Sequence, residues 1–370
     1  MSVHDRDLPV LPVEGPNGVG ETDTGSFDAA RGQAIRTQEA IQQMTGADMR
    51  LKALKAFVTL GIADILDDDE FRHSDDLAEI CQADPQMLGR FLHDMHAHGV
   101  LTVDERGRYG LTPLGQALRP GEAMWAALGV ITSPLWQQAG DSLADTICTG
   151  HPHVLNGENT PYPLVTATPG LAPMFDAFMS SRTTGLAAAL AARDLGGAST
   201  VADLGGGDGT LLGMILTAHP RLNGILVERP AVAARAERHL AEQNLAGRVE
   251  FDTGDIFDEV CPPADVIIVS SILHNGDDPT NLRLLGNVRR ALKEAGPHAQ
   301  LWVVEVPLPE PGVHTSAIDL DLRMMSLFAG GRERTLRQYR ALLALAGLDL
   351  INTTCLPGGH TLMIATADSD

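Results

Sequence analysis

The sequence from Thr200 onward alternates short apolar runs with amphipathic stretches, and this alternation constrains the fold more than any other feature. Stretches such as TLLGMILTAH and NLRLLGNVRRALKEA are expected to be helices that separate the runs. Strands that alternate with helices form a parallel sheet with helices on both faces. We therefore predict an α/β chain with a Rossmann-like, doubly wound sheet over residues 196–370. The expected strands are STVADLG, LNGILVE, VEFDTGD, ADVIIVSSIL and AQLWVVEV.

A glycine-rich turn, DLGGGDG at residues 203–209, lies between the first expected strand and the helix expected near Thr210. Glycines let the backbone approach a ligand closely, and a helix N-terminus presents free N–H groups. Glu228 ends the next strand, 23 residues after Gly205, where a carboxylate can accept hydrogen bonds from both ribose hydroxyls. The pattern indicates a site for an adenosine-type ligand. Its binding candidates are Gly205, Gly207, Glu228 and Arg229.

The charges around this turn favour one kind of adenosine ligand. The dinucleotide fingerprint is G-x-G-x-x-G, whereas here Asp203 precedes the glycines and Asp208 interrupts them, so both would repel phosphates. These negative charges favour a ligand that carries an ammonium and a sulfonium. Asp255, after the third strand, offers an acceptor for an adenine amino group, with Ile256 and Phe257 as an apolar wall. The implied cofactor is S-adenosylmethionine.

The chain before residue 196 is expected to have three parts. They are a disordered tail at 1–28, a winged-helix dimerisation domain at 29–120 and a helical connector at 121–195 that contributes to the substrate pocket. Apolar spacing between Ala34 and Leu66 predicts two helices with Gly46 between them. SDDLAEICQ and DPQMLGRFLHDMHAHGVL then predict two short helices, and LTVDERGRYGLT predicts a β-hairpin that turns at Gly107. This order is typical of a winged helix.

Charge and cysteine content exclude several classes of protein. The formal net charge of −21 makes nucleic acid and anionic membrane surfaces unlikely partners. The four cysteines lie far apart without a CxxC pair, which argues against a zinc knuckle or a disulfide framework and favours a reducing cytoplasm. We find no apolar, charge-free run of about 18 residues and expect a protein that is neither exported nor membrane-spanning.

Six ordered motifs between about Thr37 and the C-terminus resemble one known family. They are LGIADIL, the pair LGRFLHDMHAHGVL and YGLTPLGQAL, VADLGGGDG, GDIF, ILHNGDDPTNLRLLGNVRRAL and GGRERT. The chain is similar to the plant-type and actinobacterial small-molecule O-methyltransferases with a winged-helix dimerisation domain. This resemblance implies an S-adenosylmethionine-dependent methyltransferase that acts as a homodimer on a small aromatic acceptor.

The resemblance also implies catalytic residues. His274 matches the family's general base, and Glu333 and Glu305 match the two acids that flank and orient it. A phenol with a pKa of about 10 is a poor nucleophile at neutral pH, so an imidazole with a pKa of about 6.5 is a suitable group to take its proton. The alternative for each acid is a role without catalysis, as a helix cap or as an acidic residue at the rim of the site. The expected reaction is a direct methyl transfer without a metal, because no carboxylates cluster at metal-ligand spacing in the sequence.

Two positions depart from the family pattern. The base is followed by Asn275-Gly276 where the family has Asp-Trp, which removes a substrate-contacting carboxylate and a pocket aromatic. Ser270 stands where the family has Lys or Arg, which leaves the cofactor carboxylate with a weaker partner. Met179, Met324 and Phe328 match positions that line the acceptor pocket in relatives, although such side chains also suit a core.

Three functions compete at this stage. The first is methylation of a phenolic hydroxyl on an aromatic or polyketide-type natural product, with N-methylation left open. The second is a relative that retains the cofactor but hydroxylates or decarboxylates a polyketide. The third, a winged-helix regulator of transcription, is disfavoured because acidic residues outnumber basic ones in the winged-helix segment.

Overall fold

The computed structural model describes residues 24–66, 70–257, 261–311, 313 and 315–368. The chain divides into two compact units at Lys52, and the second unit contains the winged-helix cassette, the connector and the large sheet. This boundary falls within a long helix.

One long helix, α1 (Thr24–Thr59), replaces the two helices expected around Gly46. A glycine inside a helix costs only about 1 kcal/mol relative to alanine, so Gly46 does not interrupt it. The break comes at Gly61, whose φ of 67° lies in the left-handed region, before α2 (Ile62–Ile65). The expected tail at 1–28 lies outside the described residues up to residue 23, and residues 24–28 belong to α1. No helix in the described ranges is long and apolar enough to cross a membrane.

The cassette has the helix, helix, hairpin order expected of a winged helix. Its elements are α3 (Ser74–Ile80), α4 (Pro85–Ala97), β1 (Leu101–Val103), β2 (Tyr109–Leu111) and α5 (Pro113–Gln116). The Asp84 side chain caps α4 by accepting the N–H of Met87 at 2.9 Å. The hairpin pairs Leu101 with Leu111 and turns at Gly107, whose φ is 73°. Local capping and turn residues therefore specify this cassette.

The connector is a series of short helices followed by one long helix. They are α6 (Ala123–Ile131), α7 (Pro134–Asp141), α8 (Leu143–Thr149), η2 (His153–Leu155), α9 (Tyr162–Ala167) and α10 (Leu171–Ala191). Their buried side chains pack with three residues of the α14 region in one cluster, called here the connector core. It contains Val130, Leu135, Ala139, Val154, Leu155, Val165, Leu171, Met324, Leu327 and Phe328.

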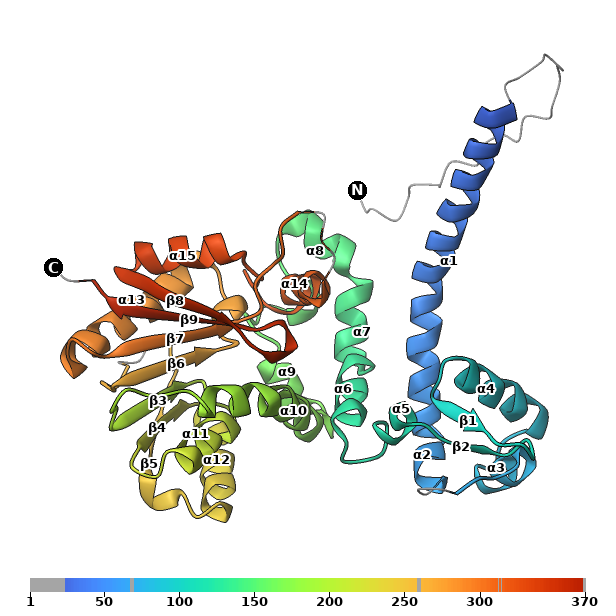
Figure 1. Ribbon diagram of the computed structural model, residues 1–370, viewed down its shortest axis with the longest axis horizontal. Coiled ribbons are helices and arrows are strands. Elements are labelled where there is room, and N and C mark those ends of the chain that lie inside the picture. Colours follow the sequence, from blue (N-terminus) through green and yellow to red (C-terminus); the bar gives the residue numbers. More distant parts are fainter. Residues whose placement is uncertain (1–23, 67–69, 258–260, 312, 314, 369–370) are drawn as a thin grey trace. The chain divides into compact units, whose positions relative to one another are not determined.

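A seven-stranded sheet follows, with the order β5-β4-β3-β6-β7-β9-β8 (Figure 1). Its strands are β3 (Thr200–Leu204), β4 (Asn223–Glu228), β5 (Val249–Thr253), β6 (Val266–Ser270), β7 (Gln300–Glu305), β8 (Leu348–Cys355) and β9 (Thr361–Ala367). The five strands expected from the sequence are parallel, as predicted, whereas β9 is antiparallel to both its neighbours. The β8–β9 pair was not among the expected strands.

Helices cover both faces of this sheet. They are α10, α11 (Thr210–Ala218), α12 (Pro230–Glu242), α13 (Asp278–Ala295) and α15 (Leu336–Leu345), whereas α14 (Ser316–Leu327) packs in the connector core. Val201 and Ile268 pack on one face with α10, α11 and α12, while Ala202 and Ile267 pack on the other with α13 and α15. Burial on both faces explains why these strands are continuous apolar runs. The Rossmann-like α/β prediction is confirmed.

Candidate active site

The expected site residues meet at one edge of the sheet. Strands β3, β4, β6 and β7 are parallel, so their carboxyl ends lie side by side. The glycine turn follows β3, Glu228 ends β4, Ser270 ends β6 and Glu305 ends β7. Strand β3 lies between β4 and β6, which makes this edge the topological switch point where α/β proteins bind ligands.

The glycine turn is too tight for other residues. Gly205, Gly207 and Gly209 have φ values of 69°, 60° and 80°, in the left-handed region. A Cβ on Gly205 would lie 2.6 Å from Ile272 Cδ1, and one on Gly206 would lie 2.7 Å from Asp203 Oδ2. The backbone of this turn is therefore held close to the strand ends, as a ligand-binding turn requires.

Acidic side chains surround the turn. Glu228 Oε2 accepts the N–H of Gly207 at 3.3 Å, and Glu228 Oε1 accepts that of Arg229 at 2.8 Å. Asp203 is 1% exposed and its Oδ2 has no hydrogen-bond partner. Burial, and then the charges of Glu228 and Asp208, raise the pKa of Asp203 to about 7. An orphaned acceptor in an acidic pocket fits a cationic, donor-bearing ligand and disfavours a phosphate.

The other proposed cofactor residues differ in their burial and in their contact with the glycine turn. Ile256 lies against the turn, since its Cδ1 would be 3.4 Å from a Cβ on Gly205, and Ile256 and Phe257 both pack on the sheet core. Asp255 is exposed, and its Oδ1 accepts the N–H of Phe257 at 2.9 Å. Ser270 is half-buried at the strand end. Of the two residues expected to form an apolar wall, Ile256 is thus the one that lies adjacent to the turn.

Tyr162 is a site residue that the sequence reading missed. The Arg229 guanidinium lies 4.5 Å from the centre of its ring and 3.5 Å from Glu228 Oε1. Burial raises the pKa of Tyr162 to about 12, an effect that the Arg229 charge and a hydrogen bond with Asn275 oppose and the Glu228 charge adds to. Tyr162 therefore connects the Glu228 side of the site with the residue that follows His274. Only its position in the Pro-rich connector hinted at this role.

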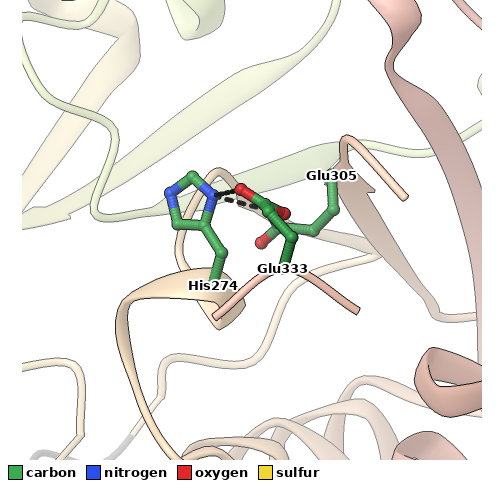
Figure 2. Close-up of side chains that lie close together, drawn as sticks. All are labelled: His274, Glu305 and Glu333. Atoms are coloured by element: carbon green, nitrogen blue, oxygen red, sulfur yellow. Dashed lines mark hydrogen bonds and ion pairs between the residues drawn. The ribbon is translucent and has the colours of Figure 1, made fainter. Parts of the chain in front are cut away.

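His274 lies on a short turn, η4 (Leu273–Asn275), directly after β6. Its Nδ1 is 2.8 Å from Glu333 Oε1 and 3.4 Å from Glu305 Oε2, and both carboxylates are buried (Figure 2). An ionised carboxylate only accepts hydrogen bonds, so Nδ1 carries the proton and Nε2 keeps its lone pair. The structure brings together the three residues that the resemblance named as base and flanking acids.

The two carboxylates change the protonation of the imidazole. Burial by itself lowers the pKa of His274, but the Glu305 charge and the Glu333 hydrogen bond outweigh it, so the net pKa is raised above 6.5. Burial raises the pKa of Glu305 to about 7, in spite of the lowering effect of His274. The backbone N–H groups of Ile272 and Leu273 hold Glu305 Oε1 at 3.0 and 2.7 Å.

Arg334 and Asn281 hold the turn that carries the base, and the sequence reading named neither. Arg334 donates to the carbonyl oxygens of Leu273 at 2.7 Å and Gly276 at 2.9 Å. The Asn281 amide donates to the same two oxygens at 2.7 and 3.1 Å. The available signal was the motif GGRERT, in which Arg334 directly follows Glu333.

The triad also has the composition of a metal site. Single ligand atoms of His274, Glu305 and Glu333 lie within 4.8 Å of one another. No carboxylates cluster at metal-ligand spacing in the sequence, but in the folded chain these residues, which are distant in sequence, converge. The short Nδ1 to Glu333 contact satisfies the imidazole without an ion. A metal-free reaction remains a prediction.

Aromatic rings line the connector side of the base turn. The ring pairs Trp136–Phe175, Tyr162–Phe175 and Tyr162–Phe328 have centroid separations of 5.8, 6.0 and 5.8 Å. Phe328 is close to the base turn, since a Cβ on Gly331 would lie 2.5 Å from Phe328 Cβ and 3.3 Å from the His274 carbonyl oxygen. The four acceptor-pocket candidates are placed as follows: Met324 and Phe328 are buried in the connector core, and Met179 on α10 and Asn275 on η4 are half-buried.

Comparison with known proteins defines the family. The O-methyltransferase domain matches residues 156–349, and the O-methyltransferase dimerisation domain matches residues 43–120. The O-methyltransferase SfmM3 of Streptomyces lavendulae is 34% identical over 88% of this chain and 99% of its own. The phenazine O-methyltransferase PhzM of Lysobacter antibioticus is 31% identical over 91% and 98%. The structure of the mitomycin 7-O-methyltransferase MmcR is 28% identical, with a TM-score of 0.79 over 92% of this chain and 100% of that one.

The fold is thus that of a methyltransferase. The chain belongs to the O-methyltransferase family that combines this catalytic domain with a dimerisation domain.

Proposed function

We propose that this enzyme transfers a methyl group to a phenolic hydroxyl of an aromatic or polyketide-type natural product, with His274 as the general base. One observation carries the proposal: Nδ1 of His274 is engaged by Glu333 at 2.8 Å, which leaves Nε2 as the basic nitrogen. The aromatic rings of Tyr162 and Phe328 beside the base turn suit a flat acceptor.

S-adenosylmethionine is the cofactor, and when bound it supplies an electrophilic methyl group on a sulfonium. Glu228 would accept hydrogen bonds from its ribose, and the unpartnered Asp203 Oδ2 offers an acceptor for its cationic end. Gly205 and Gly207 would let the backbone approach, with Arg229, Asp255, Ile256, Phe257 and Ser270 as further contacts. Among related structures, CalO1 is bound to the demethylated product of S-adenosylmethionine, and NcsB1 is in complex with S-adenosylmethionine itself.

Each of the site residues has its own role in the methyl transfer. His274 Nε2 takes the hydroxyl proton, which makes the oxygen nucleophilic as the methyl group moves. Glu333 and Glu305 stabilise the imidazolium that forms, because both carboxylates face Nδ1. Met179, Asn275, Met324 and Phe328 would orient the acceptor, and orientation of this kind removes much of the entropic barrier.

A second candidate function has support among relatives. The aclacinomycin 10-hydroxylase RdmB of Streptomyces purpurascens is 33% identical over 80% of this chain, and an N,N-dimethyltransferase of Streptomyces davaonensis is also 33% identical. The intact triad favours methyl transfer to oxygen, because a phenol needs a base more than a free amine does.

A screen with isotope-labelled S-adenosylmethionine against phenols and aromatic amines tests the proposal. The expected product is a labelled methyl ether, and His274→Ala should lower turnover at least about 100-fold while cofactor binding is retained. His298→Ala, an exposed histidine, is the control. Conversion of the acceptor without transfer of label would favour a hydroxylase, and a labelled methylamine would favour N-methylation.

We also propose a homodimer built on the winged-helix domain. Ile41, Met44 and Met49 on α1 are 55%, 77% and 67% exposed, and an apolar row of this kind needs a cover. Sedimentation should give twice the 39.3 kDa of one chain. A stable monomer at micromolar concentration would contradict this proposal.

A further inference from the structure

The Glu333 carboxylate depends on its own backbone for its direction. Its Oε1 accepts the Nδ1–H of His274 at 2.8 Å (Figure 2). Its Oε2 is buried and has no hydrogen-bond partner among the described residues. No second hydrogen bond therefore fixes the orientation of this carboxylate, and the position of the Glu333 backbone decides whether Oε1 faces the imidazole.

The Asp321 side chain holds this backbone. Asp321 lies on α14, and its Oδ1 accepts the N–H of Glu333 at 2.7 Å. Burial raises the pKa of Asp321, and the hydrogen bond from the Glu333 N–H opposes that rise. Aspartate is a weak helix former, and burying its carboxylate costs free energy. Its place within α14 is therefore explained by the contact with Glu333 and not by the needs of the helix.

The loop that follows α14 is packed tightly between that helix and the base turn. A Cβ on Gly331 would lie 3.0 Å from the Met324 carbonyl oxygen and 3.3 Å from the His274 carbonyl oxygen. The N–H of Arg332 donates to the same His274 oxygen at 2.8 Å. Because α14, the loop and the base turn are in direct contact, a shift of one of them displaces the others.

We infer that Asp321 is a positioning residue, which anchors the backbone of Glu333 and so holds the Glu333 carboxylate against Nδ1 of His274. This inference rests on the proposed function, in which His274 is the base. The effect of Asp321 is geometric, and a displacement of about 1 Å within a site can lower a rate on the order of 100-fold. Since α14 also carries Met324, a proposed acceptor contact, Asp321 connects the acceptor side of the site to the base.

Two substitutions separate the hydrogen bond of Asp321 from its charge. Asp321→Ala removes the acceptor, so the Glu333 backbone is free to move away from His274. Asp321→Asn keeps an oxygen that accepts the same N–H but removes the negative charge. Asp349→Ala, at an exposed position on β8, is the matched control for a lost aspartate.

The hydrogen bond between His274 and Glu333 can be observed without turnover. Proton NMR of enzyme that contains isotope-labelled histidine and is saturated with S-adenosylhomocysteine should show the Nδ1–H of His274 at low field. Loss of this signal in His274→Ala assigns it. Asp321→Ala should move the signal to higher field or abolish it, because the carboxylate no longer faces Nδ1. Asp321→Asn and Asp349→Ala should both keep it.

Turnover of an acceptor found in the screen gives a second readout. Asp321→Ala should lower kcat about tenfold or more with little change in cofactor affinity. Burial lowers the pKa of His274, but the Glu305 charge and the Glu333 hydrogen bond raise it above its ordinary value. Loss of this hydrogen bond should therefore shift the midpoint of the pH profile to lower pH. Asp321→Asn should restore most of kcat and the midpoint.

An unchanged NMR signal in Asp321→Ala would overturn the inference even if the melting temperature fell, because a purely structural residue leaves the base intact. A wild-type enzyme without the low-field signal would overturn it too. So would an Asp321→Asn variant that behaves like Asp321→Ala, since the charge and not the hydrogen bond would then act.

Failure of Asp321→Ala to fold would also count against the inference, because Asp321 would then support the fold as a whole. A signal that responds as expected would support the inference even if no labelled ether formed, in which case the proposed function alone would fail.

Discussion

Nδ1 of His274 faces Glu333 Oε1 at 2.8 Å and Glu305 Oε2 at 3.4 Å, so a single ring nitrogen is shared by two buried carboxylates. Two acids around one imidazole hold its proton more tightly than one acid would. The ionisations of His274 and Glu305 therefore depend on each other, and a pH profile of the reaction reports both groups.

The first prediction concerns this profile. Because the pKa of His274 is raised above 6.5, kcat/KM should increase with pH and level off only above that value. Glu305→Gln removes the largest cause of the raised pKa and should move the midpoint to lower pH. Glu250→Gln, at an exposed site on β5, should leave the midpoint unchanged. A midpoint that Glu305→Gln does not move would show that Glu305 is not charged when the base works.

The second prediction concerns stability. The pKa of Glu305 is about 7 in the folded chain and about 4.3 in an unfolded one, so the folded state binds this proton more tightly. The free energy of unfolding therefore falls as the pH rises from the unfolded to the folded value. His274, whose pKa is also raised, acts in the same direction. Urea unfolding at several values between pH 5 and pH 8 should show a smaller loss for Glu305→Gln than for the wild type. Parallel curves would contradict the assignment.

The third prediction concerns the cofactor. Glu228 already holds the turn through the N–H of Gly207, and its charge is available to the ribose. Glu228→Ala should weaken binding of S-adenosylhomocysteine about thirtyfold, or about 2 kcal/mol, the size of a lost charged hydrogen-bond pair. Glu250→Ala is the control for a lost surface charge. Calorimetry that finds undiminished affinity for Glu228→Ala would refute the ribose assignment.

The site was predictable from the sequence where its signals are local. The glycine turn, Glu228 and the end of β6 are encoded by short runs whose periodicity and turn residues are sufficient to place them. The meeting of His274, Glu305 and Glu333 was named only through the family resemblance, since no local pattern indicates which strand ends and loops converge.

Tertiary contacts account for what was missed. Strand β8 is an edge strand with several exposed residues, so its pattern is weak, and β9 is antiparallel within a series of parallel strands. Gly46 was read as a break, but a glycine interrupts a helix only where the backbone leaves the helical region, as at Gly61. Tyr162 gains its place beside the site from packing between elements that are far apart in sequence.

The fourth prediction distinguishes a base from a metal site. The triad could hold a divalent cation by its composition, yet the direct contact between His274 and Glu333 describes a hydrogen-bonded base. Dialysis against a chelator should leave kcat and the pH midpoint unchanged, and added Zn²⁺ should inhibit by occupying the lone pair that the reaction needs. Loss of activity on chelation, restored by a metal, would contradict the metal-free mechanism.

The fifth prediction concerns Arg334 as a positioning residue. It is 1% exposed and donates to the carbonyl oxygens on both sides of His274 and Asn275. Lysine cannot reproduce this planar fork, so Arg334→Lys should lose at least one of these hydrogen bonds while Asn281 still donates to both oxygens. The expected cost is about 1 kcal/mol of stability, the size of one lost hydrogen bond.

If Arg334 has only a structural role, Arg334→Lys should lower the stability and nothing else. If Arg334 positions His274, the substitution should also change catalysis. Arg334→Lys should lower kcat about tenfold or more with little change in cofactor affinity, because the imidazole is no longer fixed against Glu333. Its pH midpoint should also shift toward lower pH as that hydrogen bond weakens. Arg337→Lys, at an exposed position on α15, is the matched control. If both variants behaved alike, the Arg334 side chain would not position the base.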